Sequence, residues 1–403
     1  MSAKQTVRHL TNLQGARVFV RVDFNVPLDG STITEDTRIR AALPTLAFLR
    51  SAGAQLVLAS HLGRPKKGPT ETLSLRPVAT RLAELMDCDV ILAADCVGAD
   101  VRDRAASMKP GDILLLENVR FHPEEEANDP GFARALIQDS GASIFVNDAF
   151  GTAHRAHAST AGVAPHVTRR VAGLLMDREI HYLGLALSSP PRPYIAIIGG
   201  AKVSDKITVI ENLLPKVDTL LIGGGMAYTF FKAFGYNTGK SLVEEDKVAL
   251  AGKLLDAGKG KILLPFDHVV ASAFKADAET KTLPVTETPE GWMGLDIGPQ
   301  TVAAFGHEIR KAALVLWNGP MGVFEMKPFS TGTFEVAKAL ADSKATTIVG
   351  GGDSVAAIAE SGLMDRITHV STGGGASLEF LGGDTLPGVE CLDDDPAPAS
   401  AAG

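Results

Sequence analysis

Charged and polar side chains follow each apolar run in the first half of the chain. They are Asp23 and Asn25, then Arg38, His61 and Arg64, Glu117, Asn118 and Arg120, Asn147 and Asp148, and finally His154, Arg155 and His157. Four of them are arginines, whose guanidinium forks match carboxylate and phosphate oxygens. These residue types predict a site for a compact polyanion, such as a phosphorylated acid.

The alternative is that these residues cap helices and pair with surface carboxylates, which is the usual role of any single arginine. Four arginines at successive strand ends favour the ligand interpretation. His154 and His157 could indicate a metal. No cysteine or carboxylate completes a recognisable ligand set with them, so we assign no zinc.

Glycine ends the apolar runs of the second half. The turns are 199–202, 223–225, 318–320, 350–354 and 373–375. A glycine-rich turn before a helix exposes N–H donors that suit phosphate, although such turns also allow tight strand-to-helix packing. With Lys202, Lys206 and Asp353 among them, they predict a nucleotide site with a divalent metal.

Common nucleotide motifs are absent from these turns. The pattern G-x-G-x-x-G fails because Tyr228 and Val355 stand where it needs its last glycine. The hypothesis of a dinucleotide-dependent dehydrogenase therefore loses support. The stretch 239–241 resembles the end of a Walker A loop, but Phe234 stands where that motif needs glycine. A protein that closes on an anion without chemistry is the other alternative, and it would not need Lys202, Lys206 or Asp353.

The elements that position these residues are short, continuous apolar runs with helical stretches between them, which is typical of buried parallel strands in an α/β fold. We expect strands at 17–26, 55–59, 90–93, 113–116 and 143–146, and helices at 37–51 and 75–86. A second series lies at 194–198, 219–222, 261–264, 313–317, 346–349 and 368–371. Ligands of such sheets bind beyond the carboxyl ends of the strands.

Between the two series, Met176, Ile180, Leu183 and Leu187 repeat at helical spacing. This pattern predicts one helix that ends before Pro190 and joins two α/β domains. The last residues, 393–403, are acidic and rich in Pro, Ala and Ser, and we expect them to be disordered.

Composition sets wider limits. The chain has 403 residues, 45% of them hydrophobic, which excludes a disordered chain and allows two to three domains. A net charge of −8 disfavours a nucleic-acid binder held by a basic face. Three scattered cysteines, no signal-peptide core and no long apolar stretch predict a cytoplasmic protein without a membrane span.

Long stretches of the chain resemble the phosphoglycerate kinase family. They are RVDFNVPL (21–28), SHLGRP (60–65), LLLENVRFHPEEE (114–126), VNDAFGTAHRAHAST (146–160), GGAKVSDK (199–206), GWMGLDIGP (291–299), WNGPMGVFE (317–325), GGGDS (350–354) and STGGGASLEFL (371–381). These matches run in order over almost the whole chain. The resemblance is therefore specific to the enzyme as well as to the fold.

The resemblance implies two Rossmann-like, three-layer αβα domains with parallel sheets joined by a hinge helix. Residues 1–172 would bind the acid together with a returning C-terminal segment, 382–403; residues 173–188 would form the hinge helix, and residues 189–381 would bind the nucleotide. The family transfers a phosphoryl group reversibly between 1,3-bisphosphoglycerate with ADP and 3-phosphoglycerate with ATP in glycolysis. Transfer to the carboxylate would be in line and would follow hinge closure in a cytoplasmic monomer.

The resemblance also implies roles for single residues. The acid would bind to Asp23, Asn25, Arg38, His61, Leu62, Gly63, Arg64, Arg120 and Arg155. The nucleotide would bind to Lys206, Gly294, Glu325, Gly351, Gly352, Asp353 and Ser354, with Asp353 also holding Mg²⁺. Arg38 and Lys202 would act on the transferring phosphoryl group. The sequence departs from the family pattern at 381–384 and runs on past the family's usual end, and neither departure touches these residues.

Overall fold

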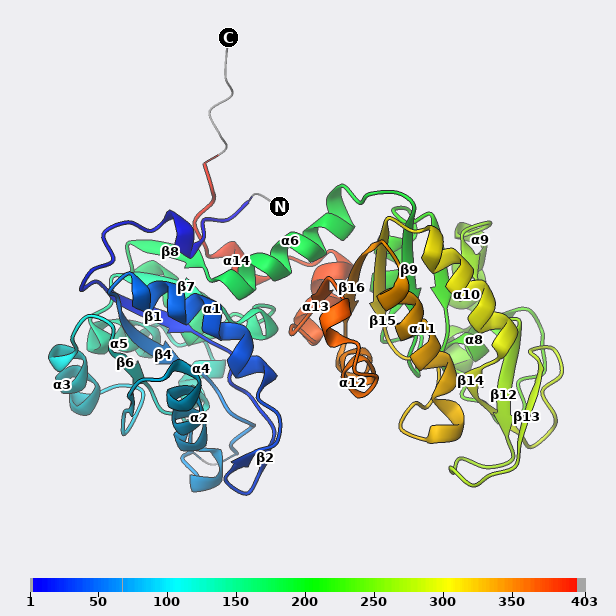
Figure 1. The fold of residues 1–403 in the computed structure, drawn as a ribbon, viewed down its shortest axis with the longest axis horizontal. Coiled ribbons are helices and arrows are strands. Elements are labelled where there is room, and N and C mark those ends of the chain that lie inside the picture. The colour runs from blue at the N-terminus through cyan, green and yellow to red at the C-terminus, as the bar shows by residue number, and fades with distance from the viewer. Residues whose placement is uncertain (1–2, 67, 397–403) are drawn as a thin grey trace, which may run out of the picture. The chain divides into compact units, whose positions relative to one another are not determined.

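The computed structural model describes residues 3–66 and 68–396, which form two α/β units (Figure 1). Unit 1 contains residues 3–181 and 385–396, and unit 2 contains residues 182–384. The division falls inside helix α6 (Leu174–Ser188), between His181 and Tyr182. No helix among the described residues is both long enough and apolar enough to span a bilayer.

Unit 1 is built on a six-stranded parallel sheet in the order β5-β6-β4-β1-β7-β8. Its strands are β1 (Arg17–Arg21), β4 (Gln55–Ala59), β5 (Val90–Leu92), β6 (Ile113–Leu115), β7 (Ile144–Asn147) and β8 (Arg169–Ala172). Its helices are α1 (Thr37–Ser51), α2 (Arg76–Met86), α3 (Ala99–Ser107), α4 (Pro123–Glu126), α5 (Pro130–Ser140) and α14 (Pro387–Glu390), and a small hairpin joins β2 (Leu28–Asp29) to β3 (Thr32–Ile33).

Helices cover both faces of this sheet. Val18, Leu56 and Ile113 share one core with the buried faces of α1 and α2. Because side chains alternate along a strand, their neighbours Phe19 and Val57 point to the opposite face, where they are also fully buried. Helices α3 and α5 pack against one another, and α5 contacts β1. Burial on both faces explains why these strands are continuously apolar rather than alternating.

The C-terminal segment packs on unit 1. Asn147 Nδ2 donates to the Gly388 carbonyl at 2.8 Å, and Arg170 Nε donates to Asp393 Oδ1 at 2.7 Å. Lys4 Nζ lies 2.7 Å from Asp394 Oδ1. The expectation of disorder was therefore wrong for 393–396, because basic side chains of unit 1 bind these acidic residues. Residues 397–403 lie outside the described part of the chain.

Unit 2 has a parallel sheet in the order β11-β10-β9-β15-β16-β17. Its strands are β9 (Tyr194–Ile198), β10 (Thr219–Ile222), β11 (Ile262–Leu263), β15 (Leu314–Asn318), β16 (Thr346–Gly350) and β17 (His369–Val370). Its helices are α7 (Ile207–Leu213), α8 (Ala227–Ala233), α9 (Val248–Ala257), α10 (Pro299–Lys311), α11 (Thr331–Asp342), α12 (Gly352–Glu360) and α13 (Gly375–Gly382). The side chains of α10 and α11 form one core with Ile195, Val315 and Trp317.

An antiparallel sheet in unit 2 was not predicted. It has the order β13-β12-β14, from β12 (Asp267–Ala271), β13 (Thr280–Pro284) and β14 (Met293–Ile297). Strand β13 is almost wholly exposed and therefore lacks an apolar run. Edge strand β8 was missed for a similar reason, since its first two residues are half-buried arginines.

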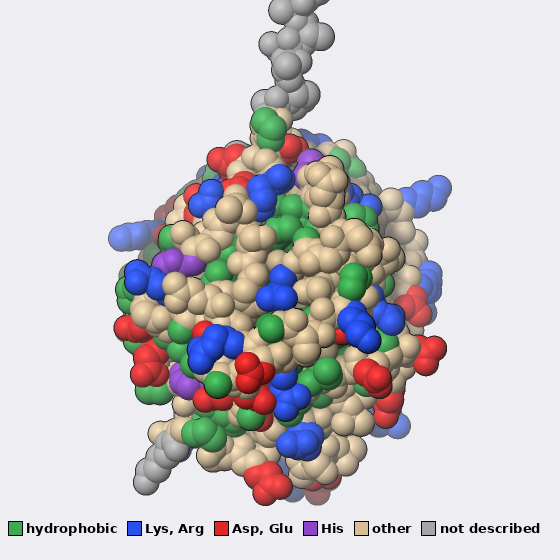
Figure 2. Space-filling model, turned by 90° about the vertical axis from the view of Figure 1, so that its left-hand side faces the viewer, with side chains coloured by type: hydrophobic (Ala, Val, Ile, Leu, Met, Phe, Trp, Pro, Cys, Tyr) green, Lys and Arg blue, Asp and Glu red, His purple; other side chains and the backbone are tan. Residues whose placement is uncertain are grey.

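Basic and acidic side chains intermingle on the face of the molecule shown in Figure 2. That face carries no continuous field of one sign, in keeping with the net charge of −8. Any strong anion site must therefore be local rather than spread over this surface.

Candidate active site

Strand order brings the predicted basic residues of unit 1 to one edge. Strands β6, β4, β1 and β7 are consecutive neighbours and parallel, so their carboxyl ends lie side by side. The loops that follow them carry all the predicted acid-binding residues except Arg38. These are Asp23 and Asn25 after β1, His61, Leu62, Gly63 and Arg64 after β4, Arg120 after β6 and Arg155 after β7. Arg38 lies in the first turn of α1, which follows β1 along the chain.

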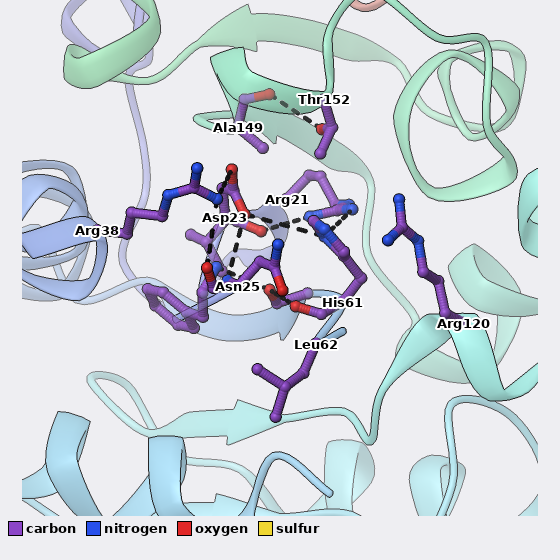
Figure 3. Close-up of polar contacts among 12 residues, drawn as sticks. Arg21, Asp23, Asn25, Arg38, His61, Leu62, Arg120, Ala149 and Thr152 are labelled. Carbon is purple, nitrogen blue, oxygen red and sulfur yellow. Dashed lines mark hydrogen bonds and ion pairs between the residues drawn. The ribbon is translucent and has the colours of Figure 1, made fainter. Parts of the chain in front are cut away.

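Asp23 lies at the centre of this edge, with Arg38 pointing toward it (Figure 3). Arg38 Nη1 lies 3.1 Å from Asp23 Oδ2 and donates to the Asn25 carbonyl at 3.3 Å. The other carboxylate oxygen accepts from the Asn25 backbone N–H at 3.2 Å. Asp23 thus holds an arginine in place and lowers the positive charge around it.

Side-chain amides tie the neighbouring loops together. Asn25 Oδ1 accepts from the Gly63 N–H at 2.8 Å, and Arg120 Nη1 donates to the Gly63 carbonyl at 2.9 Å. Asn118, fully buried, accepts from the Leu62 N–H and donates to its carbonyl. These bonds fix the loop after β4 between the loops after β1 and β6. Asn118 was among the polar residues that the sequence placed at the strand ends, but no binding role was assigned to it.

The site is electropositive. Burial lowers the pKa of Arg120, and the nearby charges of Arg155 and Arg64 lower it further. The Glu126 carboxylate, 3.1 Å from Arg120 Nε, opposes this shift. Arg155 and Arg64 are both exposed. Burial also puts the pKa of His61 well below its usual range, with additional effects from arginines 21, 120 and 38. His61 is therefore neutral at pH 7, while two exposed guanidinium groups beside Arg120 are open to an anion.

Three residues that sequence reasoning missed lie beneath this surface: Arg21, Glu125 and Ser159 are all essentially buried. Arg21 had a recognisable signal, because it is a charged residue inside the buried run 17–26. Glu125 and Ser159 gave none, since glutamates and serines are common in exposed helices and loops.

Metal ligands are not assembled around the predicted histidines. Within the described ranges, three His, Cys or carboxylate ligand atoms lie within 4.8 Å of one another only at Asp95, Cys96 and His122. There His122 Nε2 lies 2.6 Å from Asp95 Oδ1, and the Cys96 thiol donates to the Glu117 carbonyl at 3.0 Å. Burial raises the pKa of Cys96 well above its usual range, which opposes the thiolate that a metal would need.

Unit 2 contains a cavity of about 550 Å³, within the size range of small-molecule sites. Gly294, Glu325 and Asp353 of the predicted set line it. Its wall includes residues of the unpredicted β12–β14 sheet, among them His268 of β12, whose Nδ1 lies 2.8 Å from the Oη atom of Tyr228 in α8. A Cβ atom on Gly294 would lie 1.4 Å from Tyr228 Oη, so this glycine is required by close packing.

The glycine turns of unit 2 divide into two kinds. A Cβ at Gly199 or Gly319 would lie 2.2 Å from a backbone oxygen of the other turn, so these turns pack against each other. Gly352, at the start of α12, has open space around its Cα. Gly351 precedes it with φ +89°, a conformation that favours glycine. Packing therefore explains the first pair. A Cβ on Gly351 would also lie 2.9 Å from Asn318 Nδ2, so the open space that suits backbone approach to a ligand is at Gly352.

Lys206 and Asn318 are joined at the end of β15. Lys206 Nζ donates to Asn318 Oδ1 at 2.5 Å, and burial lowers the pKa of the lysine. Asn318 Nδ2 is buried without a partner among the described residues. The Ser354 side chain is fully buried, and its Oγ accepts from the Gly319 N–H at 2.6 Å. Lys202 lies on the same loop as Lys206, exposed and outside the cavity lining.

Asp353 has the character of a magnesium ligand. Its side chain is exposed at the cavity, and no hydrogen bond or ion pair of the described chain occupies it. Mg²⁺ in nucleotide sites typically takes one or two carboxylates together with substrate phosphates. One free carboxylate beside the open start of α12 fits this pattern.

A family model for phosphoglycerate kinase matches residues 7–384. The chain is 59% identical over 395 residues to the phosphoglycerate kinase of Moorella thermoacetica, covering 97% of this chain and 100% of that one. It is 54% identical over 403 residues to a cytosolic phosphoglycerate kinase of Triticum aestivum, covering 98% and 100%. The solved structure of phosphoglycerate kinase from Coxiella burnetii is similar, with a TM-score of 0.87 and 41% identity, covering 96% and 98%.

The chain belongs to the phosphoglycerate kinase family. It is a phosphotransferase that moves a phosphoryl group reversibly between ATP and the carboxyl group of 3-phosphoglycerate, a reaction of glycolysis. The family and fold predicted from sequence are confirmed. The dehydrogenase and the non-catalytic binding protein are set aside.

Proposed function

We propose that unit 1 binds the phosphoglycerate at the edge formed by β6, β4, β1 and β7. The observation that carries this proposal is that Arg38 and Arg120 lie at one edge of the sheet, with the exposed Arg64 and Arg155 beside Arg120. Arg64 and Arg155 offer free guanidinium groups to the phosphate. His61, Asn25 and Asp23 suit the carboxyl and hydroxyl end, while the loop backbone at Leu62 and Gly63 frames it.

The nucleotide binds in the cavity of unit 2. The apolar wall suits the base near Gly294, and Glu325 suits the ribose hydroxyls. The N-terminal turn of α12 at Gly351, Gly352 and Ser354 approaches the phosphates through backbone N–H groups. Lys206 and the unpartnered amide of Asn318 add donors beside this turn, since a Cβ atom on Gly351 would lie 2.9 Å from Asn318 Nδ2.

The chemistry needs charge neutralisation more than proton transfer. The acceptor carboxylate is already ionised at pH 7, so no general base is required. Arg38 and Lys202 stabilise the negative charge that develops on the transferring group. Mg²⁺, held by Asp353, supplies charge neutralisation on the nucleotide phosphates when bound.

Transfer requires the two bound substrates to meet with water excluded. We propose that closure about α6 does this, because water would hydrolyse the acyl phosphate. The enzyme works as a monomer in the cytoplasm. The cytosolic relative from Triticum aestivum supports that location.

Calorimetry of two variants tests the assignment of substrates to units. Arg120→Ala should weaken 3-phosphoglycerate binding and leave ADP binding unchanged. Glu325→Gln should do the reverse, since its carboxylate lines the other site. Loss of ADP binding in Arg120→Ala, with normal binding of the acid, would contradict the assignment.

A further inference from the structure

A buried chain of polar groups leads from Glu125 to His61. The Glu125 side chain is fully buried, and its two oxygens accept from the Ser159 hydroxyl at 2.6 Å and the Ser159 N–H at 2.8 Å. Ser159 Oγ in turn accepts from Arg21 Nε at 2.7 Å. The hydroxyl proton is therefore given to Glu125, and its oxygen holds the arginine.

Arg21 is the next link. Its side chain is almost completely buried, one Nη donates to the Val22 carbonyl, and the other lies 3.3 Å from His61 Nδ1 (Figure 3). A guanidinium group has only donors and keeps its proton in proteins. In this contact His61 Nδ1 must therefore be the acceptor, which requires that the ring proton is on Nε2.

The other charged groups near the ring do not offer a competing arrangement. Asp23 Oδ1 is the only carboxylate oxygen that the described chain places near Nδ1, and at 3.9 Å it is too far for a hydrogen bond. Arginines 21, 38 and 120 and His157 all oppose a second proton on the ring. Glu125 is the buried negative charge that balances Arg21, and His157 Nδ1 lies 4.0 Å from it.

We propose that Glu125 and Ser159 are positioning residues that act through Arg21 to hold His61 as the neutral tautomer with the proton on Nε2. His61 then presents a hydrogen-bond donor to an oxygen of the acid substrate. The hydrogen bond to the acid rests on the proposed function, because it takes the edge of unit 1 as the acid site. The tautomer of His61 concerns the free enzyme alone.

If Glu125 and Ser159 had a purely structural role, it would be to neutralise the buried Arg21. Both roles predict that removing Glu125 or Ser159 lowers stability. Only the positioning role predicts that removing either group changes the tautomer of His61 while the protein remains folded. The tautomer is therefore the decisive measurement.

¹⁵N NMR of the full-length enzyme labelled at histidine reads the tautomer directly. The chain has 10 histidines, and the His61 signal is identified by its loss in His61→Gln. In the wild type we expect an unprotonated Nδ1 and a protonated Nε2. A wild-type His61 that carries its proton on Nδ1 would overturn the proposal without any further variant.

Ser159→Ala and Glu125→Gln then test the links. We expect a mixture of His61 tautomers and a KM for 3-phosphoglycerate raised about tenfold, the effect of one weakened hydrogen bond to a charged group, with the KM for ATP unchanged. Ser159→Thr keeps the hydroxyl and should retain the wild-type tautomer. Folded Ser159→Ala and Glu125→Gln enzymes with a wild-type tautomer would refute the role of these residues.

Asp139→Asn is the matched control. Asp139 also accepts from a backbone N–H, that of Gly98, and from an arginine, Arg102, but it lies at the C-terminal end of α5, before β7 begins. That position is at the opposite edge of the sheet. The control should leave the His61 tautomer and both KM values unchanged.

Adding 3-phosphoglycerate separates this proposal from the proposed function. The His61 Nε2 signal should shift on saturation in the wild type. The His61 tautomer could be as proposed and change in Ser159→Ala and Glu125→Gln, while its signal does not shift with 3-phosphoglycerate. That result would confirm the positioning role of Glu125 and Ser159 and refute the location of the acid site.

Discussion

Arg38 Nη1 lies 3.1 Å from Asp23 Oδ2, so the arginine that we place nearest the transferring group is held by a carboxylate of the same sheet edge. A guanidinium fixed in this way loses little freedom when charge develops beside it, which is the basis of electrostatic stabilisation in a transition state. The same contact could serve structure alone. The first prediction separates these roles.

Arg38→Ala should lower kcat by on the order of 10³ if Arg38 acts as an arginine finger does. A residue that bound only the ground-state acid would raise KM and leave kcat unchanged. Steady-state kinetics with both substrates varied distinguishes the two. Arg38→Lys should recover part of the loss, because an ammonium supplies charge without the planar fork.

Arg120→Ala is the comparison for this series and should mainly raise the KM for the acid. Circular dichroism must first show that each variant is folded, because Arg38 also bonds to the Asn25 carbonyl. A folded Arg38→Ala enzyme with nearly normal kcat would refute its catalytic role and leave Lys202 as the main cationic side chain at the chemistry.

Asp353→Asn should raise the Mg²⁺ concentration needed for half-maximal rate. The amide keeps the shape of the side chain but removes the charge that a hard divalent cation prefers. Binding of 3-phosphoglycerate alone should not change, since that site is assigned to unit 1. An unaltered magnesium requirement would count against Asp353 as the ligand.

Sulfate should compete with 3-phosphoglycerate. Arg64 and Arg155 are exposed beside Arg120, and a sulfate ion offers the same oxygen geometry as a phosphate group. Initial-rate kinetics should show competition with the acid, weakened in Arg64→Ala. Inhibition that is purely competitive with ATP would place the anion site on unit 2 and contradict its assignment to unit 1.

Gly294→Ala should raise the KM for ATP and lower stability, because the added methyl group would overlap Tyr228 Oη. The acid KM should be unchanged. Gly252→Ala, in helix α9, is the control, because the nearest atom to its Cβ is 4.0 Å away. That substitution should stabilise the protein by about 0.5–1 kcal/mol. Normal ATP kinetics in Gly294→Ala would show that the wall at Tyr228 does not border the bound nucleotide.

Asp148 should make stability depend on pH. Burial raises its pKa to about 6, although Oδ1 accepts from the Leu175 and Met176 N–H groups of α6. The pKa of Asp148 in the folded protein lies above the unfolded value of about 3.9. The protonated carboxyl therefore contributes a stability that is complete below pH 4 and is lost as pH rises through 6. Relative to Asp148→Asn, the wild-type free energy of unfolding should fall by about 1 to 2 kcal/mol between pH 5 and 8. Urea titrations at both pH values give this free energy. If it changed equally for the two proteins between pH 5 and 8, the raised pKa of Asp148 would be contradicted.

Every strand of the two parallel sheets except the edge strand β8 could be located from sequence, and the central strands stand out because they are buried on both faces. Burial of both faces requires a continuous apolar run, and β9 and β10 begin and end where those runs do. Strand β1 ends earlier than expected, at Arg21. Val22, Phe24 and Val26 continue the apolar run but are buried in the core after the chain has left the sheet.

The chemistry at the strand ends could also be read from sequence, since side chains that bind ligands interrupt an apolar pattern. Arg38, His61 and Asp353 stand out in this way, and the family resemblance extended the set to residues such as Gly294 and Glu325. Strand order then brought the acid-site residues together, and that order depends on which strands pair rather than on any single strand.

Only the tertiary structure could decide which groups support the site from below. Glu125 and Ser159 are 34 residues apart, and neither stands out locally. Their burial beside Arg21 comes from the packing of three separate segments. The wall at Tyr228 and His268 likewise depends on an antiparallel sheet whose β13 strand is polar and exposed. Sequence patterns record which side chains avoid water, whereas pairing between distant buried polar groups is set by the fold as a whole.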